Sequence, residues 1–360
     1  MAKTPKIRFK NFSDEWVENK LGNISDITTG KLNANAMKED GKYDFYTSGI
    51  QKYKIDIPAF EGPAITIAGN GATVGYMYLA DGKFNAYQRT YVLLNFKENR
   101  IFLFFEIKNK LSKKIAQEAR AGNIPYIVLD MLTNLEIFTP IAKEQQKIGA
   151  FFSKLDKLIA LHQSKFEKLQ KIKKSCLQNL FPQNNQNTPK IRFKNFSDEW
   201  VENKLGDTII SIPFKAYLAN AEKIGNYPVI QQGDIPIAGY SNQEPFLDFC
   251  NVVLFGDHTL SLYNPKSPFL LASDGIKILS AKNLYDDFLF QLLKKYMPKS
   301  EGYKRHFSIL KNICFYYPNS EEQEKIGAFF SKLDKLIALH QSKFEKLQKI
   351  KKSCLQNMFV

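Results

Sequence analysis

The sequence predicts an α+β fold in which two domains of mixed strands and helices are joined by two long helices, packed as an antiparallel coiled coil with pseudo-twofold symmetry. Two duplications carry this prediction. Residues 4–22 recur unchanged at 188–206, and residues 147–179 recur unchanged at 325–357. Copies this far apart cannot stack as neighbouring units of a solenoid. We therefore expect two equal frames, each made of one copy of the shorter repeat and one copy of the longer repeat.

The frames enclose two segments, 23–146 and 207–324, which do not resemble each other. Identical frames with different inserts present two different surfaces in matched positions. The polar stretch PQNNQN at 182–187 is typical of a linker. The predicted segments are a first domain at 1–143, a first spacer helix at 144–181, the linker at 182–187, a second domain at 188–321 and a second spacer helix at 322–360.

The longer repeat has the apolar spacing of a helix. Neither Gly nor Pro interrupts it after Gly149, and Pro182 ends it. About 34 residues at about 1.5 Å each give a rod of roughly 50 Å. The wide apolar face needs a partner, and the second copy offers the same face. The seam comprises Ile148, Phe152, Leu155, Ile159, His162, Phe166, Leu169 and Cys176, with Lys173 as a gap.

The inserts and the shorter repeat have weaker patterns. In the repeat, Ser13 is expected to cap a helical turn begun by Asp14 and Glu15, while Phe9, Phe12 and Trp16 anchor the segment to a core. In the inserts, strands are predicted within 65–79 and 251–263, helices at 101–117 and 286–296, and returning strands that contain proline at 137–140 and 315–318.

The composition predicts a cytoplasmic protein with an anionic partner. No run of eighteen apolar residues occurs, and the first residues, MAKTPKIRFK, lack the apolar stretch of a secretory signal. The net charge of +15 favours nucleic acid or an anionic membrane as a partner. The cysteines show no C-x-x-C spacing, so reduced thiols and no metal site are expected. They are Cys176, Cys250, Cys314 and Cys354.

The charge lies mainly on the long repeat. Each copy has eight Lys and two acidic residues, so the two copies supply 12 of the 15 net charges. One interpretation is a solvated face; the others are a strip along a phosphate backbone or a docking face for an acidic partner. The possible phosphate strip comprises Lys154, Lys157 and Lys168 with their second-copy equivalents Lys332, Lys335 and Lys346.

The sequence contains no complete catalytic motif. Gly69, Gly71 and Gly75 differ from a dinucleotide fingerprint and favour a turn between strands. The stretch NIPY at 123–126 departs from the Asn-Pro-Pro-Tyr of amino-methyltransferases, and Glu106 fits a helix face better than a nuclease site. We therefore predict no catalytic residue and no metal ligand.

The inserts do offer polar and aromatic side chains suited to base edges. Arg and Lys can read guanine in the major groove, and Asn and Gln can read adenine. Others would hold phosphate only. The candidate DNA-binding residues are Asn70, Thr73, Asn85, Gln88, Arg89, Arg120 and Asn123 in the first insert, and His258, Lys266, Lys277, Tyr303, Lys304 and Arg305 in the second.

Several stretches, in their order, resemble the specificity subunit of type I restriction-modification systems over essentially the whole chain. The openings PKIRFKNFSDEW at Pro5 and Pro189 are similar to the start of that family's domains. The helix FFSKLDKLIALHQ is similar to its spacer coil. The body and exit of its recognition domains are matched by TIAGNGATVGYMYL, AGNIPYIVLDML and PIAKEQQKI in the first half, and by FGDHTL, GYKRHF and EEQEKI in the second.

The resemblance implies a subunit that binds DNA and is not itself an enzyme. Each recognition domain would read half of an asymmetric, bipartite target, and the coiled coil would set the gap. Two modification subunits, which methylate adenine, and restriction subunits, which cut DNA, are the implied protein partners. S-adenosylmethionine, Mg²⁺ and ATP would be bound by those partners and no cofactor by this chain. A helix of roughly 50 Å corresponds to about 15 base pairs at 3.4 Å each.

Other functions remain open at this point. The chain could be the recognition subunit of a different multi-subunit restriction-modification system, or a coiled-coil scaffold that binds only protein. It could also be a nuclease or methyltransferase that acts alone. Turnover by the purified chain with S-adenosylmethionine or Mg²⁺ would indicate an enzyme, and loss of sequence-dependent DNA binding would indicate a scaffold.

Overall fold

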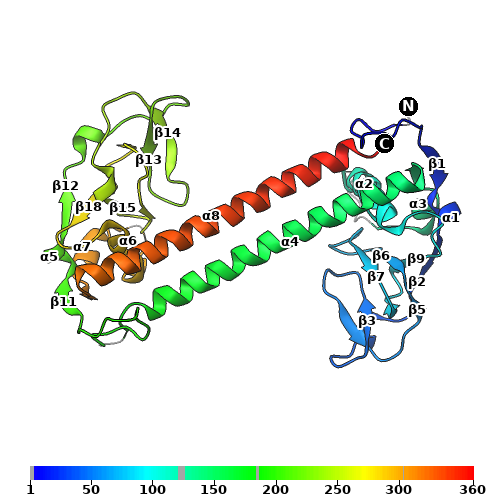
Figure 1. Ribbon diagram of the computed structural model, residues 1–360, viewed down its shortest axis with the longest axis horizontal. Helices are drawn as coiled ribbons and strands as arrows, with labels where there is room; N and C mark the ends of the chain where they lie inside the picture. Colours follow the sequence, from blue (N-terminus) through cyan, green and yellow to red (C-terminus); the bar gives the residue numbers. More distant parts are fainter. Residues whose placement is uncertain (1–3, 121–125, 184–185, 303) are drawn as a thin grey trace. The chain divides into compact units, whose positions relative to one another are not determined.

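The computed structural model describes residues 4–120, 126–183, 186–302 and 304–360, without the side chains of 118–120 and 251. The chain forms two compact units. The first consists of Met1–His162 with Ser342–Val360, and the second of Gln163–Gln341. These units divide each long helix between them, whereas the five segments expected from the sequence treat each helix as one piece; those five boundaries remain a prediction. Figure 1 traces the elements along the chain.

The first variable domain, residues 23–146 of the first unit, contains two four-stranded sheets, ordered β2-β9-β6-β7 and β4-β3-β8-β5. The predicted strands within 65–79 are confirmed, because β6 pairs with β7 in antiparallel register. The glycine-rich stretch between them is a turn, as predicted, in which Gly71 and Gly75 have positive φ angles. The strands are β2 (Asp26–Thr29), β3 (Tyr43–Tyr46), β4 (Tyr53–Ile55), β5 (Phe60–Glu61), β6 (Ala64–Ala68), β7 (Met77–Ala80), β8 (Lys83–Ala86) and β9 (Thr90–Leu94).

Helices and a frame strand cover this domain. The predicted helix at 101–117 is confirmed by α2 (Arg100–Arg120), which buries Phe102, Phe105 and Leu111 in the core. The returning strand β10 (Glu136–Thr139) pairs with β1 (Val17–Lys20) of the shorter repeat. The remaining short elements are α1 (Leu21–Ile24), η1 (Ala34–Ala36) and α3 (Leu129–Thr133).

The second variable domain, residues 207–324, has the same plan with different residues. Its sheets are ordered β12-β18-β15-β16 and β14-β13-β17, and β11 pairs with the returning strand β19, as β1 pairs with β10. The strands predicted within 251–263 and the returning strand at 315–318 are confirmed. Strand β11 (Val201–Lys204) belongs to the shorter repeat. The strands of the domain are β12 (Ile209–Ile212), β13 (Tyr227–Ile230), β14 (Ile237–Ser241), β15 (Val253–Gly256), β16 (Leu262–Tyr263), β17 (Leu270–Leu271), β18 (Ile276–Ala281) and β19 (Cys314–Tyr317).

The main helix of the second domain is shorter than α2 of the first. The predicted helix at 286–296 is confirmed by α6 (Asp286–Lys295), whose Phe288, Leu289 and Leu292 are buried. Among the described residues, no helix is both long and apolar enough to cross a membrane. The other helical elements are α5 (Leu205–Thr208), η2 (Lys215–Tyr217), η3 (Phe249–Asn251) and α7 (Phe307–Lys311).

The two long helices, α4 (Ala142–Asn179) and α8 (Ser320–Asn357), run antiparallel within each unit. In the first unit Asp156 of α4 pairs with Lys351 of α8, and in the second Lys173 of α4 pairs with Asp334 of α8. The two ion pairs join the same repeat positions with the helices exchanged. The predicted antiparallel pairing with pseudo-twofold symmetry is therefore confirmed, and Lys173, a gap in the apolar seam, supplies an ion pair.

Helix α4 ends two residues before its predicted limit at 181, and α8 ends three residues before its predicted limit at 360, because the next residues leave each helix to fill a core. Leu180 and Phe181 are buried in the second unit, and Met358 and Phe359 are buried in the first. In both units the end of the long helix forms the same backbone hydrogen bond with the shorter repeat. The amide of Ile7 donates to the carbonyl of Asn357 at 2.9 Å, and that of Ile191 donates to Asn179 at 3.0 Å.

The shorter repeat is extended, so the helical turn predicted at Ser13–Glu15 is wrong. Trp16 is buried, and β1, which begins at the next residue, must be extended to pair with β10. Both requirements favour an extended backbone before β1 over a helical turn. The packing role is confirmed, since Phe9 and Trp16 join the core of the first unit.

A buried carboxylate at the end of each insert holds the shorter repeat. Arg8 donates to both oxygens of Glu144 at 2.8 Å, and Arg192 donates to both oxygens of Glu322 at 2.9 and 2.6 Å. A bidentate, charge-assisted pair of this kind fixes direction as well as distance. The sequence pattern did not identify this contact, because its partners lie more than 120 residues apart along the chain.

Replacing Glu106 with Gln is expected to stabilise the chain at alkaline pH. The Glu106 carboxyl is buried on α2, and burial raises its pKa from 4.5 to about 8 against the opposing charge of Lys110, whose Nζ lies 3.9 Å away. A pKa raised by folding costs stability as pH rises from the unfolded value through the folded one. The gain of Glu106→Gln should therefore be small at pH 5 and reach up to about 4 kcal/mol at pH 9. Thermal unfolding between these values measures it, with exposed Glu136→Gln as the control. Parallel pH profiles for native chain and Glu106→Gln would contradict the prediction.

Candidate nucleic-acid interface

Three turns meet at one edge of the sheets in the first variable domain: residues 47–52 between β3 and β4, 69–76 between β6 and β7, and 87–89 between β8 and β9. We call them the first loop cluster. Ser48 Oγ donates to Asn70 Oδ1 at 2.6 Å, and Thr73 Oγ1 donates to the Ser48 carbonyl. The Gly69 amide donates to the Arg89 carbonyl at 2.9 Å. These contacts bind the three turns into one surface.

Four of the seven candidates in this domain lie on the first loop cluster. Gln88 and Arg89 are exposed, while Asn70 and Thr73 are half-buried. Asn85 lies elsewhere: it is 3 % exposed, its amide donates to the Ile57 carbonyl, and its Oδ1 accepts from the Ala86 amide, both at 2.8 Å. Both polar atoms of the Asn85 side chain therefore form hydrogen bonds with the backbone. The side chain of Arg120 and all of Asn123 lie outside the described residues.

The second variable domain places equivalent turns together: residues 231–236 between β13 and β14, 257–261 between β15 and β16, and 272–275 between β17 and β18. We call these, with 300–302 and 304–306, the second loop cluster. The His258 amide donates to Gln232 Oε1 at 3.2 Å, and the Gly233 amide donates to Ser261 Oγ at 2.9 Å. The Asp257 amide donates to the Gly275 carbonyl at 2.8 Å, which matches the Gly69–Arg89 bond of the first domain.

A buried pair fixes the last of these loops. His306 is fully buried; its Nε2 accepts from the Glu301 amide at 3.1 Å, so in the neutral ring Nδ1 carries the proton and donates to the Asp257 carbonyl at 3.0 Å. The Asp257 carboxylate accepts from the Phe307 amide at 2.7 Å. Lys304 and Arg305 are thus exposed on a loop whose base is anchored to the neighbouring turn.

Four of the six candidates in this domain lie on or beside the second loop cluster: His258, Lys277, Lys304 and Arg305. Arg305 lies 3.5 Å from Asp274, and Lys277 Nζ donates to the Asp274 carbonyl at 3.4 Å. Lys266 lies apart, in a cavity of about 360 Å³ with Asp287 and Lys335, beside α6 and α8. Tyr303 lies outside the described residues.

The sequence pattern missed the residues that join the turns. Ser48 and Gln232 occupy equivalent positions, each two residues after the end of β3 or β13 and before a glycine, and each contacts the next turn. In the second domain Ser261 and Asp257 also join neighbouring loops, because Ser261 accepts from the Gly233 amide and Asp257 accepts from the Phe307 amide. The sequence signal that could have identified Ser48 and Gln232 is a polar residue directly before a glycine at a hairpin turn.

The six strip lysines are all exposed on the long helices. Lys173 and Lys351, which lie on the same helices, are instead half-buried and bound to Asp334 and Asp156. The exposed positions leave the strip lysines free to approach phosphate or a protein partner, and their role remains a prediction.

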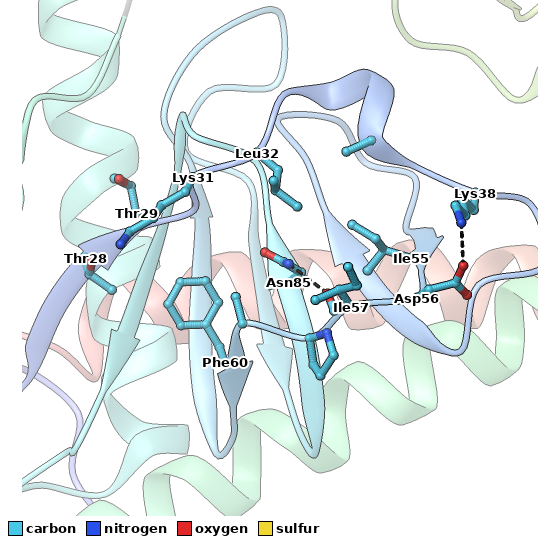
Figure 2. Close-up of a pocket in the computed structure, with 13 residues that line it drawn as sticks. Thr28, Thr29, Lys31, Leu32, Lys38, Ile55, Asp56, Ile57, Phe60 and Asn85 are labelled. Carbon is cyan, nitrogen blue, oxygen red and sulfur yellow. Dashed lines mark hydrogen bonds and ion pairs between the residues drawn. The ribbon is translucent and has the colours of Figure 1, made fainter.

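The first domain also has a cavity of about 610 Å³ between its sheets, shown in Figure 2. Its lining is mostly apolar, including Leu32, Ile55 and Phe60. The lining carboxylate, Asp56, is paired with Lys38 at 2.7 Å, and the pair lowers the pKa of Asp56. An exposed ion pair beside apolar side chains offers no acid–base pair for catalysis, so the loop clusters are the better candidate site.

Comparison with known proteins identifies the family of the two domains. Residues 13–173 and 197–349 both match the family profile described as the type I restriction modification DNA specificity domain. The type I restriction enzyme EcoDI specificity subunit of Escherichia coli is 37 % identical over 158 residues, which cover 44 % of this chain and 34 % of that protein. The MjaVIII specificity subunit of Methanocaldococcus jannaschii is 24 % identical over 339 residues, 81 % of this chain and 77 % of that one.

The fold has a solved counterpart. The crystal structure of a type I restriction-modification system S subunit from M. genitalium superposes with a TM-score of 0.75 at 20 % identity, and covers 99 % of both chains. Two matched domains account for most of the sequence and for both loop clusters. The chain therefore belongs to the type I restriction-modification DNA specificity family and carries two copies of its domain.

Proposed function

We propose that this chain selects the DNA target of a type I restriction-modification complex, with each variable domain reading one half of an asymmetric, bipartite sequence. One observation carries the proposal: two unlike inserts place equivalent turns in equivalent contacts on identical frames. Constant frames with variable loops are the arrangement expected where one partner-docking surface is combined with the reading of different DNA sequences.

The loop clusters offer the chemistry that base edges require. Asn70 and Gln88 can pair with adenine, and Arg89 and Arg305 with guanine, each by two hydrogen bonds in the major groove. Because the clusters differ in their side chains, the two half-sites should differ too. The two long helices would set the number of unread base pairs between them.

Neutralising the strip lysines is expected to flatten the salt dependence of DNA binding. Six contacts to phosphate would steepen the slope of log K against log salt by about 5, so replacing all six with Gln should remove up to that amount. Binding measured between 50 and 300 mM salt gives the slope. Lys174 and Lys352, exposed on another face of the same helices, are the control pair. An unchanged slope in the six-fold variant would assign the strip to solubility or partner docking.

The frames are the proposed docking sites for partner proteins. Their exposed apolar residues occur in matched pairs, such as Ile7 with Ile191 and Val17 with Val201. Identical surfaces suit two copies of one partner, so we infer two modification subunits, joined by restriction subunits, acting on DNA in the cytoplasm. Methylation and cleavage, with their S-adenosylmethionine, Mg²⁺ and ATP, would reside in those partners, and this chain would be non-catalytic.

Mapping methylated adenines in the genome of the source cell tests the proposal. We expect an asymmetric sequence in two parts with an unread gap, which disappears when the gene for this chain is deleted. A continuous or palindromic site that depends on this chain would contradict bipartite reading. Turnover by the purified chain alone, with S-adenosylmethionine or Mg²⁺, would instead favour an independent enzyme.

A further inference from the structure

Each loop cluster presents one isoleucine at the tip of its hairpin. Ile50 follows Thr-Ser-Gly after β3 and is 58 % exposed; Ile235 follows Gln-Gln-Gly-Asp after β13 and is 72 % exposed. The inserts are otherwise unlike in sequence, so nothing inherited from the repeats places an isoleucine here. A single exposed aliphatic side chain is ordinary on a protein surface. Its recurrence in the equivalent hairpin turn of two unlike domains, one residue after Gly49 and two residues after Gly233, is the feature to explain.

Both isoleucines are held by a side chain bonded to their own carbonyl. In the first cluster the Tyr78 hydroxyl donates to the Ile50 carbonyl. In the second, Gln231 Nε2 donates to the Ile235 carbonyl at 2.9 Å, and the Gln231 amide donates to the Pro236 carbonyl at 2.7 Å. Different donors therefore fix the same tip. A β-branched side chain on a fixed backbone has few rotamers, so it offers a rigid apolar contact.

Polar side chains of the proposed base-reading surface adjoin both tips. Ser48, two residues before Ile50, contacts Asn70, and Gln232, three residues before Ile235, contacts the His258 amide. Among the four bases of DNA, thymine alone presents a methyl group in the major groove, and an apolar side chain reads it by contact. An aliphatic tip among hydrogen-bonding groups therefore suits an edge that mixes one methyl with donors and acceptors.

We propose that Ile50 and Ile235 are specificity-determining residues, each contacting the C5 methyl group of a thymine in its own half-site. The proposal rests on the function proposed above and adds to it a base identity at each tip. Removing the methyl from the DNA and removing the side chain from the protein should then be equivalent changes, because each deletes the same contact.

The test uses the full chain purified with its modification subunit and a duplex that carries the mapped target. Each thymine is replaced in turn by deoxyuridine, which lacks only the methyl group. Ile50→Ala should weaken binding to the thymine duplex about three- to tenfold. At one position in one half-site, deoxyuridine should weaken the native chain by the same factor and leave Ile50→Ala unaffected. Ile235→Ala should give the same result at a position in the other half-site.

Two exposed isoleucines serve as matched controls. Ile57 is 70 % exposed and its carbonyl is also held, by Asn85, but it lines the cavity of Figure 2. Ile224 is 85 % exposed and precedes Gly225, which packs on Ser241 at the far end of β14 from the tip. Neither Ile57→Ala nor Ile224→Ala should alter binding or respond to deoxyuridine.

Selective binding by the native complex with no loss in Ile50→Ala and Ile235→Ala would overturn the methyl contact and leave the proposed function intact. A loss that adds to that of deoxyuridine at every position would overturn it equally, since the two changes would then be independent. A native complex with no sequence preference would contradict the proposed function itself, and the methyl contact with it.

Discussion

Replacing Phe359 with Ala is expected to lower the free energy of unfolding of the first unit by about 3–5 kcal/mol, the usual range for deleting a buried phenyl ring. Phe359 is 4 % exposed. Its ring stacks on Phe152 at 5.5 Å and lies 5.6 Å from Phe102 and 6.4 Å from Trp16. These neighbours belong to α4, α2 and the shorter repeat, respectively. The Phe359 ring, which follows α8, therefore packs against both the frame and the variable domain.

Urea unfolding measures this effect one unit at a time, because Trp16 lies in the first unit and Trp200 in the second. In a Trp200→Phe background, fluorescence reports Trp16 alone. Phe181→Ala, followed through Trp200 in a Trp16→Phe background, is the matched variant; Phe181 stacks on Phe288 at 5.6 Å and lies 6.1 Å from Trp200. A loss below about 1 kcal/mol in Phe359→Ala would show that the last residues do not complete the core.

Exchanging residues 23–146 for the corresponding insert of another family member is expected to change one half-site and leave the other. The frame contacts that hold the insert, such as the β1–β10 pairing and the Arg8–Glu144 pair, need only a strand and one glutamate from it. Each mismatched base pair costs about 1–3 kcal/mol, so three changed bases should shift preference by at least about 100-fold.

Selection from random duplexes, with both chains in complex with the modification subunit, measures this change. The half-site that remains identifies the domain that was not exchanged. Exchange of 207–324 is the reciprocal control and should change the other half. A change in both half-sites after one exchange would show that the domains do not read independently.

The sequence predicted the frame well because its signals are local or repeated. The seam from Ile148 to Cys176 follows from periodicity, and the antiparallel pairing follows from the pseudo-twofold arrangement of two copies with identical apolar faces. The loop clusters were only partly predictable. Asn70 and Arg89 were chosen by residue type, and so was Asn85, yet burial beside Ile57 assigns Asn85 to the backbone.

What the pattern could not supply were contacts between residues far apart in the chain. Asp257 and His306 are 49 residues apart and anchor a loop that composition alone describes as basic. Similarly, the shorter repeat has a cap-like sequence at Ser13, but burial of Trp16 and pairing with β10 outweigh a single cap, which contributes only about 1 kcal/mol.

The role of the paired helices as a spacer is tested most directly by shortening both. Deleting residues 161–167 with their equivalents 339–345 removes one heptad from each of α4 and α8, about 10 Å of helix, and preserves the spacing of the seam. Target sequences selected by the shortened chain should contain the same two half-sites at a different separation. The same half-sites at the original separation would contradict the spacer role.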